Sequence, residues 1–156
     1  MVEIGSFKQL RSDGNIISED MTVEMMIGLG WQPSTVTEFS WKCNDQLVSK
    51  CFQFGVISKL LPNRKAIAAL ISKNEEQSQE ELIVISSDGS DKFRISNIQD
   101  IAGRQREGAF CWFEPPKNTS QSSFGAAFRS IEDGAMFQVD IDAVTGQVIN
   151  TYKLQR

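Results

Sequence analysis

From residue 36 onward, the apolar residues of this chain recur mainly at every second position, and this spacing most restricts how the chain can fold. Alternate side chains of an extended strand point to opposite faces, so a period of two gathers apolar residues on one face. The segment TEFSWKC places Phe39 and Trp41 on one side and Glu38 and Ser40 on the other. The pattern predicts β structure over most of the chain.

Further segments repeat this alternation along the chain. Two of them, AIAALIS and ELIVIS, are apolar on both faces, which is typical of central strands or of strands beneath a helix. The other predicted strands follow at intervals of about ten residues, in the segments CFQFGVI, KFRIS, AFCWFE, SFGAAFRSI, AMFQVDI and QVINTYKL. Even spacing of short strands predicts an antiparallel meander, sandwich or barrel.

Turn signals separate these strands. Asp-Gly between apolar runs favours a tight hairpin, because both residues tolerate positive φ. Four such pairs occur, at Asp13-Gly14, Asp88-Gly89, Asp133-Gly134 and Thr145-Gly146, if the related Thr-Gly pair is included. Their intervals share no fixed period, so the sequence does not predict a repeat fold.

One helix is predicted in SEDMTVEMMIGLG, residues 18–30. Ser18 or Asp20 can cap its N-terminus, and Gly28 or Gly30 can take the left-handed C-terminal position. A second short helical turn is predicted in NIQDIAGRQ. The predicted fold class is therefore α+β: one domain over residues 1–156, mainly antiparallel β with roughly seven to ten strands, and a short N-terminal helix packed on the sheet.

The charge balance limits the classes of partner. Twenty acidic and sixteen basic side chains give a net charge of -4 and a pI near 4.9. These values argue against nucleic acid or an anionic membrane as a partner and favour a basic protein. The N-terminus lacks the apolar core of a signal peptide, and no run approaches the roughly 20 apolar residues that span a bilayer. We therefore expect a cytoplasmic protein; the oligomeric state is not predicted.

The chain contains no histidine, and this excludes histidine-based nucleophile systems, proton shuttles and zinc ligation by histidine. The three cysteines, Cys43, Cys51 and Cys111, form no C-x-x-C pair, so we interpret them as reduced, partly buried thiols. No glycine-rich phosphate-binding motif is present. The sequence predicts no catalytic residue, no cofactor and no metal.

Asp140 and Asp142 come closest to a chemical motif. The segment DIDAVT resembles the D-x-D-x-[VT] nucleophile loop of haloacid-dehalogenase-type phosphotransferases, but that loop precedes most of its domain and only fourteen residues follow Asp142. A calcium loop would need an oxygen ligand, a glycine and a glutamate where this chain has Val144, Thr145 and Thr151. We predict a hairpin, in which Asp142 accepts local backbone donors and the following glycine takes positive φ.

Two segments supply candidate partner-binding residues. The polar segment KNEEQSQEE carries four glutamates, which can attract a basic partner or simply protect a strand edge. The segment GAFCWFEPP is the most aromatic, and its alternation places Phe110 and Trp112 on one face. Burial of these aromatic side chains under a helix or a second sheet is the favoured interpretation; the alternative is that Trp112 or Phe113 is exposed as an interface anchor. The candidate partner-binding residues are Glu75, Glu76, Glu80, Glu81, Trp112 and Glu114.

The combination of small size, acidic charge and missing catalytic motifs favours a non-enzymatic protein-binding module. In these general respects the chain resembles the cytoplasmic immunity proteins that bacteria make against basic nuclease toxins. That resemblance implies an inhibitor that covers a toxin's active site. Two alternatives remain open: a small β-barrel hydrolase or isomerase that uses paired carboxylates, and a carrier of lipid or another small ligand.

Overall fold

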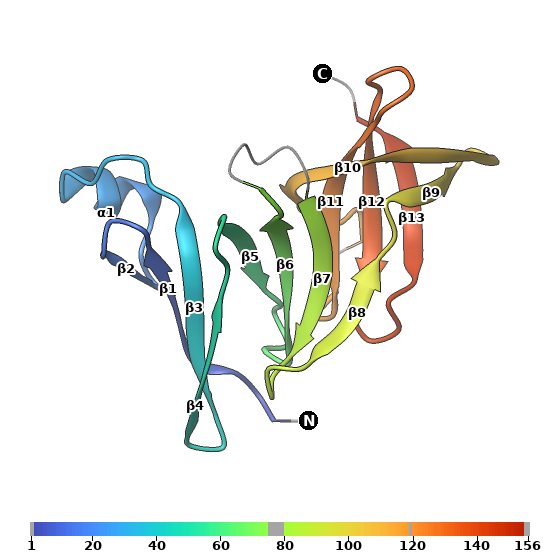
Figure 1. Cartoon of the computed structure of the whole chain (residues 1–156). Helices are drawn as coiled ribbons and strands as arrows, with labels where there is room; N and C mark the ends of the chain where they lie inside the picture. Colours follow the sequence, from blue (N-terminus) through green and yellow to red (C-terminus); the bar gives the residue numbers. More distant parts are fainter. Residues whose placement is uncertain (1, 75–79, 119, 155–156) are drawn as a thin grey trace.

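Three antiparallel sheets stack as layers in the computed structural model, which describes residues 2–74, 80–118 and 120–154 (Figure 1). The first sheet has the strand order β2 (Ile16–Ser18), β1 (Gly5–Arg11), β3 (Val36–Cys43), β4 (Gln46–Cys51). The central sheet has the order β5 (Val56–Leu60), β6 (Ala66–Ser72), β7 (Glu80–Ser86), β8 (Asp91–Ile95). The third sheet has the order β13 (Val148–Lys153), β12 (Met136–Asp142), β11 (Ser123–Ser130), β10 (Arg104–Glu114), β9 (Ile98–Ile101).

The central sheet is buried on both faces. Ile67 and Ile83 pack into the hydrophobic cluster shared with the first sheet. Their neighbours Ala68 and Val84 point the other way, into the cluster shared with the third sheet. Because successive side chains of a strand alternate between faces, a strand between two layers must be apolar throughout. The prediction of central strands in AIAALIS and ELIVIS is therefore confirmed.

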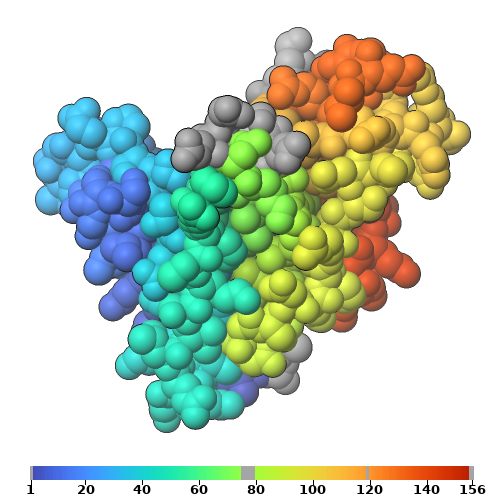
Figure 2. Space-filling model, in the orientation of Figure 1, coloured from blue at the N-terminus to red at the C-terminus, as the bar shows by residue number. Residues whose placement is uncertain are grey.

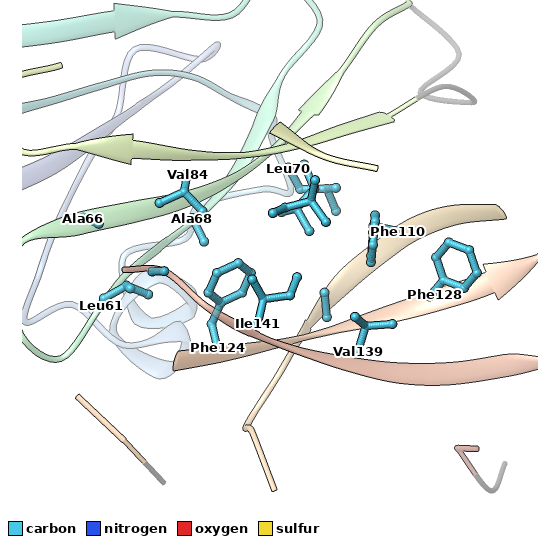
Figure 3. Close-up of a cluster of buried hydrophobic side chains, with 14 of the residues drawn as sticks. Leu61, Ala66, Ala68, Leu70, Val84, Phe110, Phe124, Phe128, Val139 and Ile141 are labelled. Atoms are coloured by element: carbon cyan, nitrogen blue, oxygen red, sulfur yellow. The ribbon is translucent and has the colours of Figure 1, made fainter. Parts of the chain in front are cut away.

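Aromatic side chains fill both interlayer cores. Between the first and central sheets, Phe39 and Trp41 are completely buried, and the Trp41 indole nitrogen donates a hydrogen bond of 2.6 Å to the Ser87 carbonyl oxygen. Between the central and third sheets, Phe110 and Phe128 pack with ring centroids 5.1 Å apart (Figure 3). Full burial of such a side chain stabilises the fold by about 1.5–3 kcal/mol, so the two cores hold the three layers together.

The predicted hairpin turns are confirmed. Each of the four glycines in question has a positive φ at a strand connection: Gly14, Gly89, Gly134 and Gly146. Gly89 and Gly146 also have no room for a side chain. An added Cβ would lie 2.8 Å from a Val48 methyl carbon at Gly89 and 2.7 Å from the Phe93 ring at Gly146. Glycine is required at these two turns for both its backbone freedom and its size.

Three local predictions were wrong. CFQFGVI does not form one strand: β4 ends at Cys51, β5 begins at Val56, and the residues between them turn the chain from the first sheet into the central one. NIQDIAGRQ forms no helical turn, because Ile98–Ile101 pairs with β10 through a tight turn at residues 102–103. The part of the chain that the structure describes contains thirteen strands, more than predicted, since several are only three to five residues long.

The predicted helix is present, but it is shorter than expected and does not pack on a sheet. α1 spans Val23–Gly28, has Thr22 as its N-cap and buries none of its residues. The sheet faces that it was expected to cover are covered by other sheets instead. Within the described residues, no helix has the length and apolar character needed to cross a membrane.

Candidate partner-binding surface

The predicted partner-binding residues fall on two strands of different sheets. Glu80 and Glu81 begin β7 in the central sheet, whereas Trp112 and Glu114 lie near the end of β10 in the third sheet. β10 crosses the same end of the molecule at which β7 begins (Figure 1), and these two strands are in direct contact. Glu75 and Glu76 lie outside the described residues.

An open groove of about 680 Å³ lies where β7 and β8 approach β10. We call it the upper groove; its lining includes Lys73, Glu80, Glu81, Arg94, Glu107 and Ile131. Two carboxylates predicted from the sequence therefore face this groove. Ile131 is largely exposed beside them, so the groove combines charged and apolar surface.

Glu81 is already paired with two cations of its own chain. Its Oε2 lies 2.8 Å from the Lys73 Nζ and 2.9 Å from the Arg94 Nη1. The carboxylate is mostly covered, while both cations extend into solvent. The charge of Glu81 is thus balanced within the chain, and its carboxylate holds Lys73 and Arg94 at the rim of the groove.

Glu80 differs from Glu81 because one of its carboxylate oxygens accepts no hydrogen bond from the described residues. Its Oε2 is buried and has no hydrogen-bond partner among the described residues. Burial raises the pKa of the Glu80 carboxyl, and the Arg129 guanidinium partly opposes this effect. Glu80 also lines a second, smaller groove of about 290 Å³ between the first and central sheets. An incoming hydrogen-bond donor would satisfy this oxygen and favour its charged form.

Trp112 and Glu114 form a joined pair on the outer face of the third sheet. The Trp112 indole nitrogen donates a hydrogen bond of 2.7 Å to the Glu114 Oε1, and the tryptophan is 37% exposed. A partly exposed tryptophan that is held in place presents a large apolar area with little loss of freedom on binding. This geometry suits an interface anchor.

The alternation predicted for this segment was wrong. A shift of register follows Phe110: Phe110 pairs with Phe128, but Trp112 pairs with Ala127. Cys111 is therefore an extra residue, and such a bulge reverses which side chains point inward. As a result Phe110 and Phe113 both contact the core, whereas Trp112 lies outside it. Period-two reasoning on the sequence cannot detect a bulge that depends on the partner strand.

The cysteines are free, as expected, and Cys43 and Cys111 are partly buried, but Cys51 is exposed, contrary to the prediction. Burial raises the pKa of the Cys111 thiol, and the nearby Glu80 carboxylate adds to this effect. Burial and Glu38 likewise raise the pKa of the Cys51 thiol. Both thiols are therefore less ionised than an ordinary cysteine at neutral pH, which disfavours a nucleophilic role.

The hairpin interpretation of Asp140 and Asp142 is confirmed. The Asp142 carboxylate accepts a hydrogen bond of 2.9 Å from the Val144 amide, as predicted. Asp140 is completely buried, and its oxygens accept hydrogen bonds from the Gln138 side-chain amide (2.7 Å) and the Lys117 backbone amide (2.9 Å). Asp140 therefore fastens the loop that follows β10 to the outer face of the third sheet.

Comparison with solved structures identifies the family. One chain in the structure of Tne2 in complex with Tni2 superimposes with a TM-score of 0.93 and 36% sequence identity, over 97% of this chain and 99% of that chain. This chain belongs to the same family as that component of the Tne2–Tni2 complex. No known family model matches this chain, and no curated protein matches it.

The likeness to the Tne2–Tni2 component extends over nearly the whole of both chains. It therefore concerns the fold as a whole rather than one shared motif. Two features had no signal in the sequence. One is the Glu80 oxygen that lacks a hydrogen-bond partner among the described residues, and the other is the hydrogen bond by which Asp140 holds the loop after β10. Both depend on residues that are distant in the chain.

Proposed function

We propose that this protein is a non-enzymatic binding module of the immunity type, which covers the active site of a toxin. The observation that carries this proposal is its near full-length likeness to a component of a two-protein complex, that of Tne2 with Tni2. In this proposal Tne2 and Tni2 are a toxin and its immunity protein, and this chain corresponds to Tni2.

The proposed binding surface combines the upper groove with the Trp112–Glu114 pair. Glu80 lines the groove, Glu81 holds two cations at the rim, and Trp112 supplies an apolar anchor. Glu75 and Glu76 precede this surface in the chain and remain part of the proposal. The net charge of -4 supports a basic partner, such as a nuclease domain. We also propose that the protein is bacterial and acts in the cytoplasm.

The two alternative functions have less support. A carboxylate-based enzyme needs two acidic groups that face one reacting bond, but Asp140 is engaged by backbone and side-chain donors, and Glu81 by two cations. A carrier needs an apolar interior space, but Phe124, Val139 and Ile141 pack into the space between the central and third sheets (Figure 3).

Binding to a toxin and protection from it test this function together. The protein encoded beside this chain and purified Tne2 serve as the two baits in calorimetric titrations. Co-expression of this chain should restore growth to cells that produce the bound toxin. Failure to bind either bait, together with no protection, would exclude the immunity function.

Variants can then test the proposed surface itself. Trp112→Ala and Glu80→Lys should each weaken binding by about 10-fold or more, as expected for an interface anchor and a reversed charge. Val144→Ser, at an exposed position in the turn between β12 and β13, is the matched control and should bind as the wild type does. If all three variants bind equally well, the toxin contacts another surface.

A further inference from the structure

α1 and the residues beside it expose an unusual amount of apolar surface. Val23 is 70% exposed, Ile27 68%, Leu29 63% and Met25 48%, and Ile16 on the neighbouring strand β2 is 54% exposed. We call these five residues the α1 patch. Val23 and Ile27 lie on one side of the helical turn and Met25 and Leu29 on the other, so α1 exposes apolar side chains around its circumference. Single exposed apolar residues are normal, but exposed apolar residues that are grouped mark an interaction site in a soluble protein.

The backbone of this region is held in place without help from these side chains. The Thr22 hydroxyl accepts a hydrogen bond of 3.2 Å from the Met25 amide at the start of α1. At its end, the Leu29 and Gly30 amides bond to helix carbonyls, and Gly30 takes a positive φ. Amides at both ends of α1 therefore have hydrogen-bond partners within the same segment. The exposed apolar side chains serve no visible purpose in the fold.

Contacts on both sides of α1 fix the region to the first sheet. Before the helix, the Glu19 carboxylate binds the Arg64 guanidinium and accepts a hydrogen bond of 2.9 Å from the Phe7 amide. After it, the Arg11 guanidinium lies 5.1 Å from the centre of the half-buried Trp31 ring. A patch that is already ordered loses little conformational entropy when a partner binds.

The same region is acidic, although two of its four carboxylates are paired with arginines outside it: Asp13 with Arg11 and Glu19 with Arg64. Residues 12–35 contain four carboxylates, Asp13, Glu19, Asp20 and Glu24, and no lysine or arginine. The other sixteen acidic residues are matched in number by the sixteen basic residues, all of which lie outside this segment. Local hydrogen bonds lower the pKa of the Asp20 carboxyl, so it stays ionised well below neutral pH. An apolar patch with an acidic border is complementary to an apolar recess with a basic border.

We propose, building on the immunity function above, that the α1 patch is a second docking element, which enters an apolar recess bordered by lysine and arginine on the same toxin. Figures 1 and 2 show α1 and β10 at the same end of the molecule, on either side of the ends of β6 and β7. A single partner seated on this end reaches both the upper groove and the α1 patch.

Two other occupants fit the patch less well. A second copy of this chain would bring its own Asp20 and Glu24 against the same two carboxylates, which repel each other. An anionic lipid surface would be repelled in the same way. The basic partner that the net charge supports has the complementary charge.

The test measures binding of the toxin to variants of the full chain. Ile27→Ser combined with Leu29→Ser should weaken binding by about 100-fold, because two apolar side chains are no longer buried in the complex. Val144→Ser is the control: Val144 is 56% exposed in the turn between β12 and β13, which lies at the opposite end of the molecule (Figure 1). Glu24→Lys should slow association several-fold, with a smaller effect at high salt. The probes are the protein encoded beside this chain and purified Tne2.

Each result has a distinct meaning. Loss of binding in the double variant but not in Val144→Ser, with unchanged unfolding temperatures, supports the docking element. Unchanged binding in the double variant, while Trp112→Ala binds weakly, overturns the docking element and leaves the immunity function intact. If the wild type binds neither probe, both fail. If sedimentation shows a dimer that the double variant abolishes, the α1 patch binds a second copy of the chain and not the toxin. If the patch binds anionic vesicles, it binds a lipid surface instead.

Discussion

Replacing Asp140 with alanine tests whether this carboxylate is a structural fastener rather than part of a metal or phosphoryl-transfer site. The side chain is completely buried and accepts hydrogen bonds from the Lys117 backbone amide and the Gln138 side-chain amide. Asp140→Ala leaves both donors without this partner. The Gln138 amide keeps its hydrogen bond to the Pro115 carbonyl oxygen but has one buried N–H left unpaired, which costs about 1–3 kcal/mol, whereas Lys117 is exposed and its amide can bind water. With about 1 kcal/mol for the lost Lys117 hydrogen bond, we expect the free energy of unfolding to fall by about 2–4 kcal/mol.

Asp142→Ala is the matched control, two residues along the same strand. Asp142 is only partly buried and makes one local hydrogen bond, to the Val144 amide. Its removal should cost about 1 kcal/mol or less. Urea unfolding followed by tryptophan fluorescence measures both variants, because the chain has three tryptophans. In a chain of this size, the loss in Asp140→Ala corresponds to a fall of about 5–15 °C in Tm.

Two results would refute this interpretation of Asp140. In the first, Asp140→Ala and Asp142→Ala lose the same small amount of stability, which would mean that the two hydrogen bonds contribute nothing. In the second, calcium or magnesium raises the Tm of the wild type and both variants lose this response, which would mean that the pair holds a cation. We expect neither divalent cation to change the Tm of the wild type.

Three further changes have defined outcomes. Burial raises the folded-state pKa of Glu80 above its unfolded value, so the stability that its protonated carboxyl contributes is lost as pH rises above about 4.5. Glu80→Gln should therefore raise the Tm at pH 7 but not at pH 4. Equal shifts of Tm at both pH values would contradict this. Gly125→Ala should lower the free energy of unfolding by about 1–3 kcal/mol, because its Cβ would lie 2.7 Å from the Glu114 carbonyl oxygen. Gly28→Ala should raise it by up to about 1 kcal/mol, because its Cβ would meet nothing within 4 Å. Chemical denaturation distinguishes the two variants. Ile83→Ala should cost about 2–5 kcal/mol in the same assay, and a loss below 1 kcal/mol would mean that the central sheet is loosely packed.

The strands and turns were the most predictable part of the structure. Asp88-Gly89 and Thr145-Gly146 predict hairpins because their backbone preferences are local. The two-sided apolar strands predict a central layer because burial on both faces leaves no polar position. These inferences need only a few neighbouring residues, which explains why they were correct.

The candidate site was only partly predictable. Glu80, Glu81, Trp112 and Glu114 were selected by charge and aromatic character, and the structure places all four near one end of the molecule. Their sequence spacing gave no indication that Glu81 pairs with two cations or that one buried oxygen of Glu80 lacks a hydrogen-bond partner among the described residues. These properties arise from contacts between different strands.

The sequence by itself determined which segments are extended, where the chain turns, that histidine chemistry is impossible, and that residues 12–35 hold the excess negative charge. Only the tertiary structure decided how the sheets stack, that a bulge at Cys111 turns Trp112 outward, and that α1 leaves its apolar side chains in solvent. The reason is that backbone preference and charge belong to each residue and its neighbours. Burial and strand register depend on a partner that is distant in the chain.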